Sequence, residues 1–150
     1  MERTLVMVKP DAVHRGLIGR IIIRFEAKGL KIVAMRMLRM DEALARRMYG
    51  VHEGKDFYEP LVRFVTAGPV VAMVLEGHSA VGICRSLMGP TAGAQAPAGT
   101  IRGDFAMSTR YNLVHGSDTR ESAEREIPLF FAPDEIVDYD LCGAKWVYPQ

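Results

Sequence analysis

His115 and Glu126 are the residues whose types and spacing point most directly to chemistry. His115 lies between an apolar, strand-like stretch and a predicted helix, in the string NLVHGSD of residues 112–118. Backbone N–H groups at a helix N-terminus favour phosphate, and a neutral imidazole, the main form at pH 7 for a pKa of about 6.5, can attack phosphorus. Glu126 falls in the predicted helix, where its carboxylate could hold the second ring nitrogen. His115 is therefore interpreted either as a phosphoryl acceptor or as a half-buried structural histidine near a turn.

Two arginines flank an uncharged loop rich in glycine and proline. The loop, residues 89–100, reads GPTAGAQAPAGT, with Arg85 before it and Arg102 after it. Long loops without secondary structure are uncommon in compact domains unless they are functional. Guanidinium groups match phosphate oxygens, and Thr91 adds a hydroxyl. These residues are either a phosphate clamp or two surface arginines with local ion pairs.

Other side chains allow both a structural and a functional interpretation. Lys9 is either a solvated strand-end lysine or a donor to hydroxyl or phosphate groups, and Phe57 and Tyr58 are either core residues or a platform for a nucleobase. No GxGxxG, GxxxxGK[ST] or GxSxG motif is present, and no histidine pair has zinc-ligand spacing. The remaining histidines have no partner spacing and are interpreted as surface residues: His14, His52 and His78.

The periodicity of apolar residues predicts the elements that position these groups. Strands are predicted at 4–8, 32–38, 70–75 and 112–115, and helices at 17–28, 41–48, 57–66, 79–88 and 118–127. Gly29 is expected as a C-cap and Asp41, Ser79 and Asp118 as N-caps, while Pro128 is expected to bend or end the last helix. Two βαβ units in this order predict an α+β fold, a ferredoxin-like βαββαβ sandwich with an antiparallel sheet covered by helices.

Composition and charge exclude several classes of protein. A length of 150 residues with 49% hydrophobic and 25% charged residues predicts one globular domain over 1–150. The net charge of +1 argues against nucleic acid or a membrane as the main partner. Cys84 and Cys142 are expected to be reduced thiols. Without a signal-peptide pattern or a long apolar run, a cytoplasmic protein is expected.

Six short segments spread along the chain form a recognisable set: TLVMVKPD (4–11), RGLIG (15–19), GPVVAM (68–73), GTIRGDF (99–105), NLVHGSD (112–118) and SAEREI (122–127). Taken together, these segments resemble a nucleoside diphosphate kinase over nearly the whole chain. The resemblance implies ping-pong transfer of the terminal phosphoryl group from a nucleoside triphosphate, mainly ATP, to a nucleoside diphosphate, with broad base specificity. An alternative is a nucleotide-responsive regulatory protein, or one that binds single-stranded nucleic acid, on the same fold.

The resemblance also implies roles for individual residues. His115 would be the nucleophile and Glu126 its orienting carboxylate, with Ser117 and Tyr49 supporting the imidazole and the phosphate region. Mg²⁺ would be held mainly by the nucleotide phosphates, without protein ligands. The nucleotide would be held by phosphate contacts from Arg85, Thr91 and Arg102, by sugar contacts from Lys9 and Asn112, and by base contacts from Phe57 and Leu61. Lys9 would also be catalytic, because it would lie near the transferring phosphoryl group.

Several positions depart from the family pattern, although none removes a residue assigned to the chemistry: Met48, Val51, Asp56, Gly93, Thr109 and Pro128. Gly93 is expected to loosen its loop, and Gly93→Pro to stabilise it if the local φ permits. The tail, 138–150, carries three aromatic residues, so it is expected to pack either on its own domain or on neighbouring subunits. The resemblance implies a homo-oligomer, and the length of the tail favours a hexamer.

Overall fold

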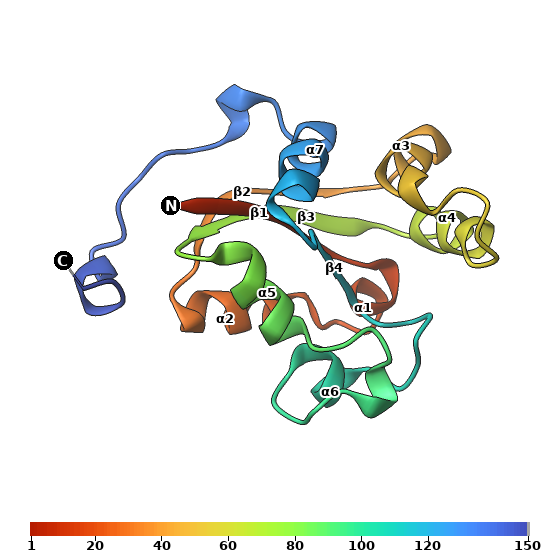
Figure 1. Ribbon diagram of the computed structural model, residues 1–150, viewed down its shortest axis with the longest axis horizontal. Coiled ribbons are helices and arrows are strands. Elements are labelled where there is room, and N and C mark those ends of the chain that lie inside the picture. Colours follow the sequence, from red (N-terminus) through yellow and green to blue (C-terminus); the bar gives the residue numbers. More distant parts are fainter. Residues whose placement is uncertain (150) are drawn as a thin grey trace.

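The computed structural model, described for residues 1–149, has a four-stranded sheet between two layers of helices (Figure 1). The strands lie in the order β2-β3-β1-β4, and each neighbouring pair is antiparallel. This topology confirms the predicted α+β, ferredoxin-like fold. The strands are β1 (Glu2–Val8), β2 (Lys31–Leu38), β3 (Val70–Gly77) and β4 (Val114–Gly116).

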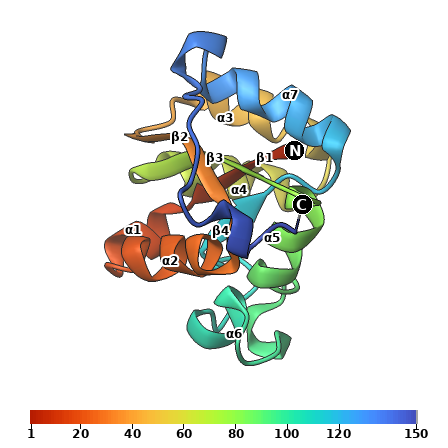
Figure 2. The same ribbon diagram turned by 90° about the vertical axis from the view of Figure 1, so that its left-hand side faces the viewer.

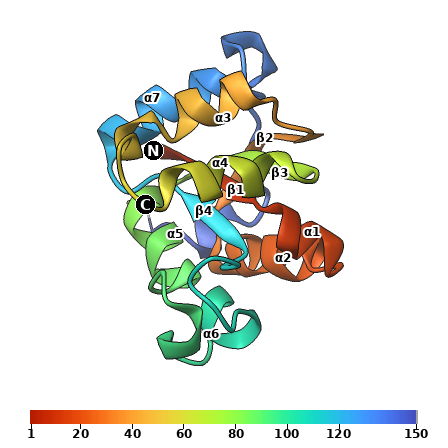
Figure 3. The same ribbon diagram turned by 90° about the vertical axis from the view of Figure 1, so that its right-hand side faces the viewer.

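Helices cover both faces of the sheet. One layer contains α3 and α7 and the other α1, α2 and α5, with α6 below it (Figures 2 and 3). The helices are α1 (Pro10–His14), α2 (Ile18–Lys28), α3 (Glu42–Met48), α4 (Tyr58–Thr66), α5 (Ala80–Met88), α6 (Ile101–Phe105) and α7 (Arg120–Phe130). Short 3₁₀ turns are η1 (Gly50–His52), η2 (Gly93–Gln95), η3 (Pro133–Glu135) and η4 (Ala144–Trp146).

The central strand β1 divides the core into two parts. Successive side chains of a strand point to opposite faces, so Val6 and Val8 pack with α1, α2 and α5, whereas Leu5 and Met7 pack with α3, α4 and α7. All four side chains are fully buried. The apolar run at residues 4–8 therefore reflects a strand covered on both faces.

Two of the predicted helix caps are confirmed. Gly29 ends α2 in the left-handed conformation with a φ of 98°, and the Asp41 carboxylate accepts a hydrogen bond from Leu44 N–H at the start of α3. A glycine adopts positive φ without steric penalty, and a short acidic side chain satisfies a free N–H at a helix start.

The other caps and one strand boundary are wrong in detail. The N-cap of α7 is Thr119, whose hydroxyl accepts from Ser122 N–H, rather than Asp118. Ser79 makes no capping bond, because the Glu2 carboxylate accepts the N–H of Val81 instead. Strand β4 begins only at Val114.

Pro128 lies inside α7, and the helix continues to Phe130. A proline in a helix removes one backbone hydrogen bond. Pro128 and Glu124, the residue one turn earlier whose carbonyl loses its donor, are both exposed, so water can satisfy that carbonyl. Of the two expected effects of Pro128, ending the helix is therefore wrong, and bending it stays a prediction.

The loop of residues 89–100 is ordered by contacts with its surroundings. It contains the 3₁₀ turn η2, and the Arg24 guanidinium donates to the Gly99 carbonyl at 2.9 Å. Gly93 is buried, and a Cβ there would lie 2.5 Å from the Cβ of Ala106. The expectation that Gly93→Pro stabilises the loop is therefore wrong, because the added ring atoms have no space.

Two of the three aromatic residues of the tail make hydrogen bonds to the domain, and the third is exposed. Tyr139 and Tyr148 donate hydrogen bonds to the carbonyls of Ile32 at 2.7 Å and Gly29 at 3.0 Å, so these parts of the tail pack on their own domain. Trp146 stays 84% exposed in the protomer. The last tail residue, Gln150, lies outside the described residues. Within residues 1–149, no helix has the length and apolar character needed to cross a membrane.

Candidate active site

A cleft of about 520 Å³ brings together nine of the side chains singled out in the sequence. This volume suits a small-molecule ligand. The nine come from the residue after β1, the segment from the end of α3 into α4, α5, the loop after α5, α6, the approach to β4 and β4 itself. They are Lys9, Tyr49, Phe57, Leu61, Arg85, Thr91, Arg102, Asn112 and His115. Ser117 and Glu126 lie behind His115.

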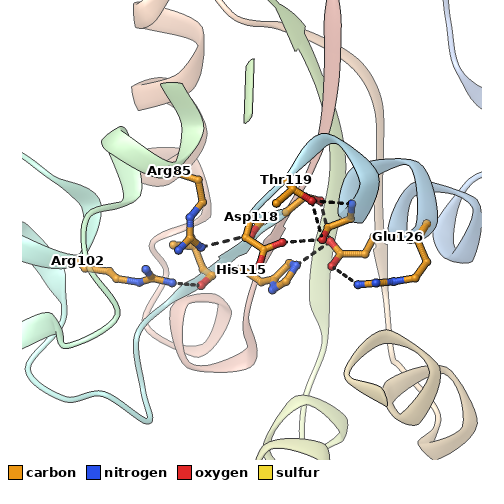
Figure 4. A network of polar contacts seen from close by, with 11 residues as sticks. Arg85, Arg102, His115, Asp118, Thr119 and Glu126 are labelled. Atoms are coloured by element: carbon orange, nitrogen blue, oxygen red, sulfur yellow. Dashed lines mark hydrogen bonds and ion pairs between the residues drawn. The ribbon is translucent and has the colours of Figure 1, made fainter. Parts of the chain in front are cut away.

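His115 projects from β4 toward Glu126 of α7 (Figure 4). Its Nε2 lies 2.9 Å from Glu126 Oε2, and the Ser117 hydroxyl donates to the same oxygen at 2.7 Å. Burial opposes ionisation of Glu126, but hydrogen bonds from His115 and Ser117, together with the nearby Arg125, outweigh it and hold its pKa below the usual range. An ionised Glu126 accepts a hydrogen bond from Nε2–H, which keeps the ring proton on Nε2 and leaves the lone pair on Nδ1.

Tyr49 borders the imidazole at the end of α3. The Tyr49 and His115 rings meet edge to face, with centroids 5.7 Å apart. Burial, followed by the charge of Glu126, raises the pKa of the Tyr49 phenol. Its hydroxyl is buried and has no hydrogen-bond partner within residues 1–149. An unpaired buried hydroxyl beside a cleft is suited to a polar atom of a ligand.

Arg102 and Arg85 both reach the cleft but in different environments. Arg102 is buried and donates to three backbone carbonyls, those of Gly89, Asn112 and Val114, at 2.8, 3.1 and 2.8 Å. Arg85 is exposed, with one N–H 3.4 Å from the Gly116 carbonyl. Burial and the charge of Arg85 lower the pKa of Arg102 to about 10. Arg102 thus joins the loop to β4, a structural role that the sequence analysis missed.

Lys9 is buried at the end of β1, so its interpretation as a solvated lysine is wrong. Its ammonium donates to Asn112 Oδ1 at 2.7 Å, and the Asn112 amide in turn lies 3.4 Å from the Thr91 carbonyl. Burial and the charge of Arg102 lower the pKa of Lys9 to about 8, against an opposing effect of Asp11. This places a titratable cation inside the cleft.

Phe57 and Tyr58 have different environments. Phe57 is 50% exposed at the cleft, whereas Tyr58 is buried in the core. His52 is half-buried and lines the cleft, with its ring 5.1 Å from the Phe57 ring, so its interpretation as a surface residue is wrong. Burial, Lys55 and His115 lower the pKa of His52. In the sequence, His52 lies between Tyr49 and Phe57, two residues assigned to the site, and this position could have indicated that it lines the cleft.

Further cleft residues were not assigned to the site from the sequence: Pro60, Phe64, Thr109, Arg110, Val114 and Gly116. Arg110 adds a cation and Phe64 an aromatic ring. No group of three or more His, Cys, Asp or Glu side chains within residues 1–149 could hold a metal ion. The cationic side chains of the cleft instead suit an anionic ligand.

Comparisons with known proteins identify the family of this chain. The family model for nucleoside diphosphate kinase matches residues 2–136. Proteins with that name from Desulfitobacterium hafniense and Ignicoccus hospitalis are 52% and 56% identical, covering 98% and 95% of this chain and 99% and 97% of their own.

Solved structures are also similar. A halophilic nucleoside diphosphate kinase from Halobacterium salinarum, in complex with CDP, has a TM-score of 0.96 at 53% identity, with 98% of each chain covered. A nucleoside diphosphate kinase family protein from Babesia bovis has a TM-score of 0.95 at 43% identity, covering 99% of this chain and 100% of its own.

The fold, the cationic cleft and these relatives define an enzyme of the class that transfers phosphoryl groups between nucleotides. Within that class, the chain belongs to the nucleoside diphosphate kinase family, as its sequence predicted.

Proposed function

We propose that the protein transfers the terminal phosphoryl group of a nucleoside triphosphate, mainly ATP, to a nucleoside diphosphate through a phosphohistidine at His115. The observation that carries this proposal is the 2.9 Å contact between His115 Nε2 and the buried carboxylate of Glu126, at the wall of a cationic cleft. A carboxylate on one ring nitrogen holds the tautomer whose other nitrogen is nucleophilic.

The reaction has two half-reactions. In the first, the Nδ1 lone pair forms a bond to the terminal phosphorus, while the bond from that phosphorus to the bridging oxygen breaks and the diphosphate leaves. In the second, a terminal oxygen of another diphosphate attacks the phosphohistidine, and the P–N electrons return to Nδ1. Glu126 stabilises the positive charge of the ring, and Ser117 holds Glu126 in place.

The other cleft residues would position the nucleotide, which is most of what phosphoryl transfer requires of a protein. Arg85, Thr91 and Arg102 would contact the phosphates, and the unpaired Tyr49 hydroxyl would face the phosphate region. Lys9 and Asn112 would contact the sugar hydroxyls, and the Lys9 ammonium would also lie near the transferring phosphoryl group. Phe57, with Leu61 nearby, would stack on the base. Stacking tolerates every base, so we expect broad specificity.

The family uses a divalent metal, and we propose Mg²⁺. The residues of the cleft fit a metal ion that is held by phosphate oxygens. The charged side chains of the cleft are cations, and within residues 1–149 no group of three His, Cys, Asp or Glu side chains could bind the ion instead. When bound, Mg²⁺ would neutralise phosphate charge. Lys9, Arg85 and Arg102 would share that task.

A label-and-chase experiment tests the proposed function. The protein is incubated with ATP labelled in its terminal phosphate, and unlabelled GDP is then added. We expect an acid-labile, base-stable protein label that moves to GTP. A protein that binds ATP but never becomes labelled would contradict the enzyme mechanism and favour a regulatory role.

The pKa of Lys9 predicts that nucleotide affinity depends on pH. Below pH 8 the ammonium is charged and attracts phosphate; above it, the unliganded protein loses that charge and must take up a proton on binding. Affinity for ADP is therefore expected to fall roughly 10-fold between pH 7.5 and 9.5. Calorimetry over this range measures the effect. In Lys9→Met, binding should be weaker at pH 7.5 and nearly independent of pH.

We also propose that the protein assembles as a hexamer. Trp146 is 84% exposed in the protomer and the loop of residues 89–100 is uncharged, and both features suit contacts between subunits. Light scattering at micromolar concentration is expected to give the mass of six chains. The mass of a monomer or dimer would contradict assembly, whereas a tetramer would contradict only the argument from the tail.

A further inference from the structure

Leu113 has a strained backbone conformation close to the proposed nucleophile. Its φ is +74°, and the only other non-glycine residue with a positive φ within residues 1–149 is Ser79. Val114 N–H donates to the Asn112 carbonyl at 2.8 Å, which together with the positive φ forms the rarer and more strained kind of γ-turn. Such a conformation persists only where the surrounding structure enforces it.

The turn at Leu113 lies between two residues whose side chains belong to the proposed site. Asn112 and His115 both line the cleft, although they are three positions apart. In a regular strand, residues separated by an odd number point to opposite faces. The positive φ of Leu113 breaks this alternation where the chain enters β4, since the adjacent side chains of Leu113 and Val114 are both buried in the same core cluster.

Residues 9–11 hold both backbone polar groups of Leu113. Lys9 N–H donates to the Leu113 carbonyl at 2.8 Å, and the Asp11 carboxylate accepts from Leu113 N–H at 3.1 Å through Oδ2. The other oxygen of Asp11, Oδ1, is buried and has no hydrogen-bond partner within residues 1–149. Of these two contacts to the Leu113 backbone, the one from Lys9 is made by the main chain and the one from Asp11 by a side chain.

We propose that Asp11 is a positioning residue for phosphoryl transfer. Its carboxylate holds Leu113 in the left-handed turn, and the turn directs His115 from β4 into the cleft beside Asn112. Asp11 itself is not among the residues that line the cleft. Its effect therefore reaches the reaction through the backbone of residues 112–115.

The test compares three variants with the wild-type chain, using the rate of His115 phosphorylation in a single turnover and the affinity for ATP. Asp11→Ala removes the contact, whereas Asp11→Asn keeps an oxygen that can accept from Leu113 N–H. Asp41→Ala is the matched control, because Asp41 also accepts a backbone N–H, that of Leu44, but lies outside the cleft. Should Asp11→Ala not fold, Asp11→Ser replaces it, since the serine hydroxyl is one bond too short to reach.

We expect Asp11→Ala to slow phosphorylation about 10-fold, as for misplacement of a reacting group by a fraction of an ångström, with a smaller change in ATP affinity. Asp11→Asn and Asp41→Ala should keep a rate near that of the wild type. A wild-type rate in folded Asp11→Ala would overturn the proposal. The proposal would also be overturned if Asp11→Ala and Asp11→Asn lost the same fraction of the phosphorylation rate and both shifted its pH profile. The loss would then come from removing the negative charge of Asp11, which acts on Lys9.

The rate measurement rests on the proposed function, so a second measurement separates the two ideas. In nucleotide-free protein, the ¹⁵N chemical shifts of the His115 ring should move in Asp11→Ala and stay in place in Asp11→Asn and Asp41→Ala. Unchanged ring shifts in Asp11→Ala would overturn the positioning role. A wild-type chain that never becomes phosphorylated would contradict the proposed function alone.

Discussion

Replacement of His115 by alanine is expected to abolish nucleotide exchange while leaving the fold intact. The imidazole is the proposed covalent carrier, and no binding contact can replace a group that forms a bond to phosphorus. Its side chain is about 20% exposed and belongs to neither core cluster, so truncation leaves the packing of the sheet in place. Coupled turnover assays and the label-and-chase experiment measure the loss.

His78→Ala is the matched control for this experiment. His78 is an exposed histidine outside the cleft, so its replacement should leave labelling and turnover unchanged. ADP should still bind His115→Ala, because the phosphate and base contacts proposed for the other cleft residues remain. Near-normal turnover by folded His115→Ala protein would rule out the phosphohistidine mechanism.

Glu126→Gln is expected to slow phosphoryl transfer by about 10–100-fold without eliminating it, by analogy with groups that orient a reactive ligand. Glu126 Oε2 accepts hydrogen bonds from both His115 Nε2 and the Ser117 hydroxyl. An amide oxygen can accept the same hydrogen bonds, but it lacks the negative charge that stabilises a cationic ring. Single-turnover phosphorylation of His115 gives the rate directly.

Glu124→Gln provides the control on the same helix. Glu124 is exposed and pairs with Arg120 one turn earlier, so this substitution should not change the rate. If Glu126→Gln kept the full rate of phosphorylation, Glu126 would be a structural residue, and another group would have to orient His115.

Much of the fold could be predicted because its signals are local. The apolar run at 4–8 and the helical spacing at 17–28 require only neighbouring residues, as do the caps at Gly29 and Asp41. The resemblance to the family was equally accessible, since it depends on short strings such as NLVHGSD. The cap at Thr119 was missed because the neighbouring Asp118 is an equally good N-cap residue by type. The continuation of α7 through Pro128 was missed because it depends on solvent exposure, which the local sequence does not show.

The sequence by itself determined the fold class, the family and the pairing of His115 with Glu126, because each is encoded in contiguous motifs and their periodicity. Only the tertiary structure decided the environments of the site residues. Burial beside Arg102 lowers the pKa of Lys9, and three backbone carbonyls from other segments accept hydrogen bonds from Arg102. The left-handed turn at Leu113 depends on Asp11, a residue about one hundred positions away in the chain. These properties arise from contacts between segments far apart in sequence, which no local pattern of residues specifies.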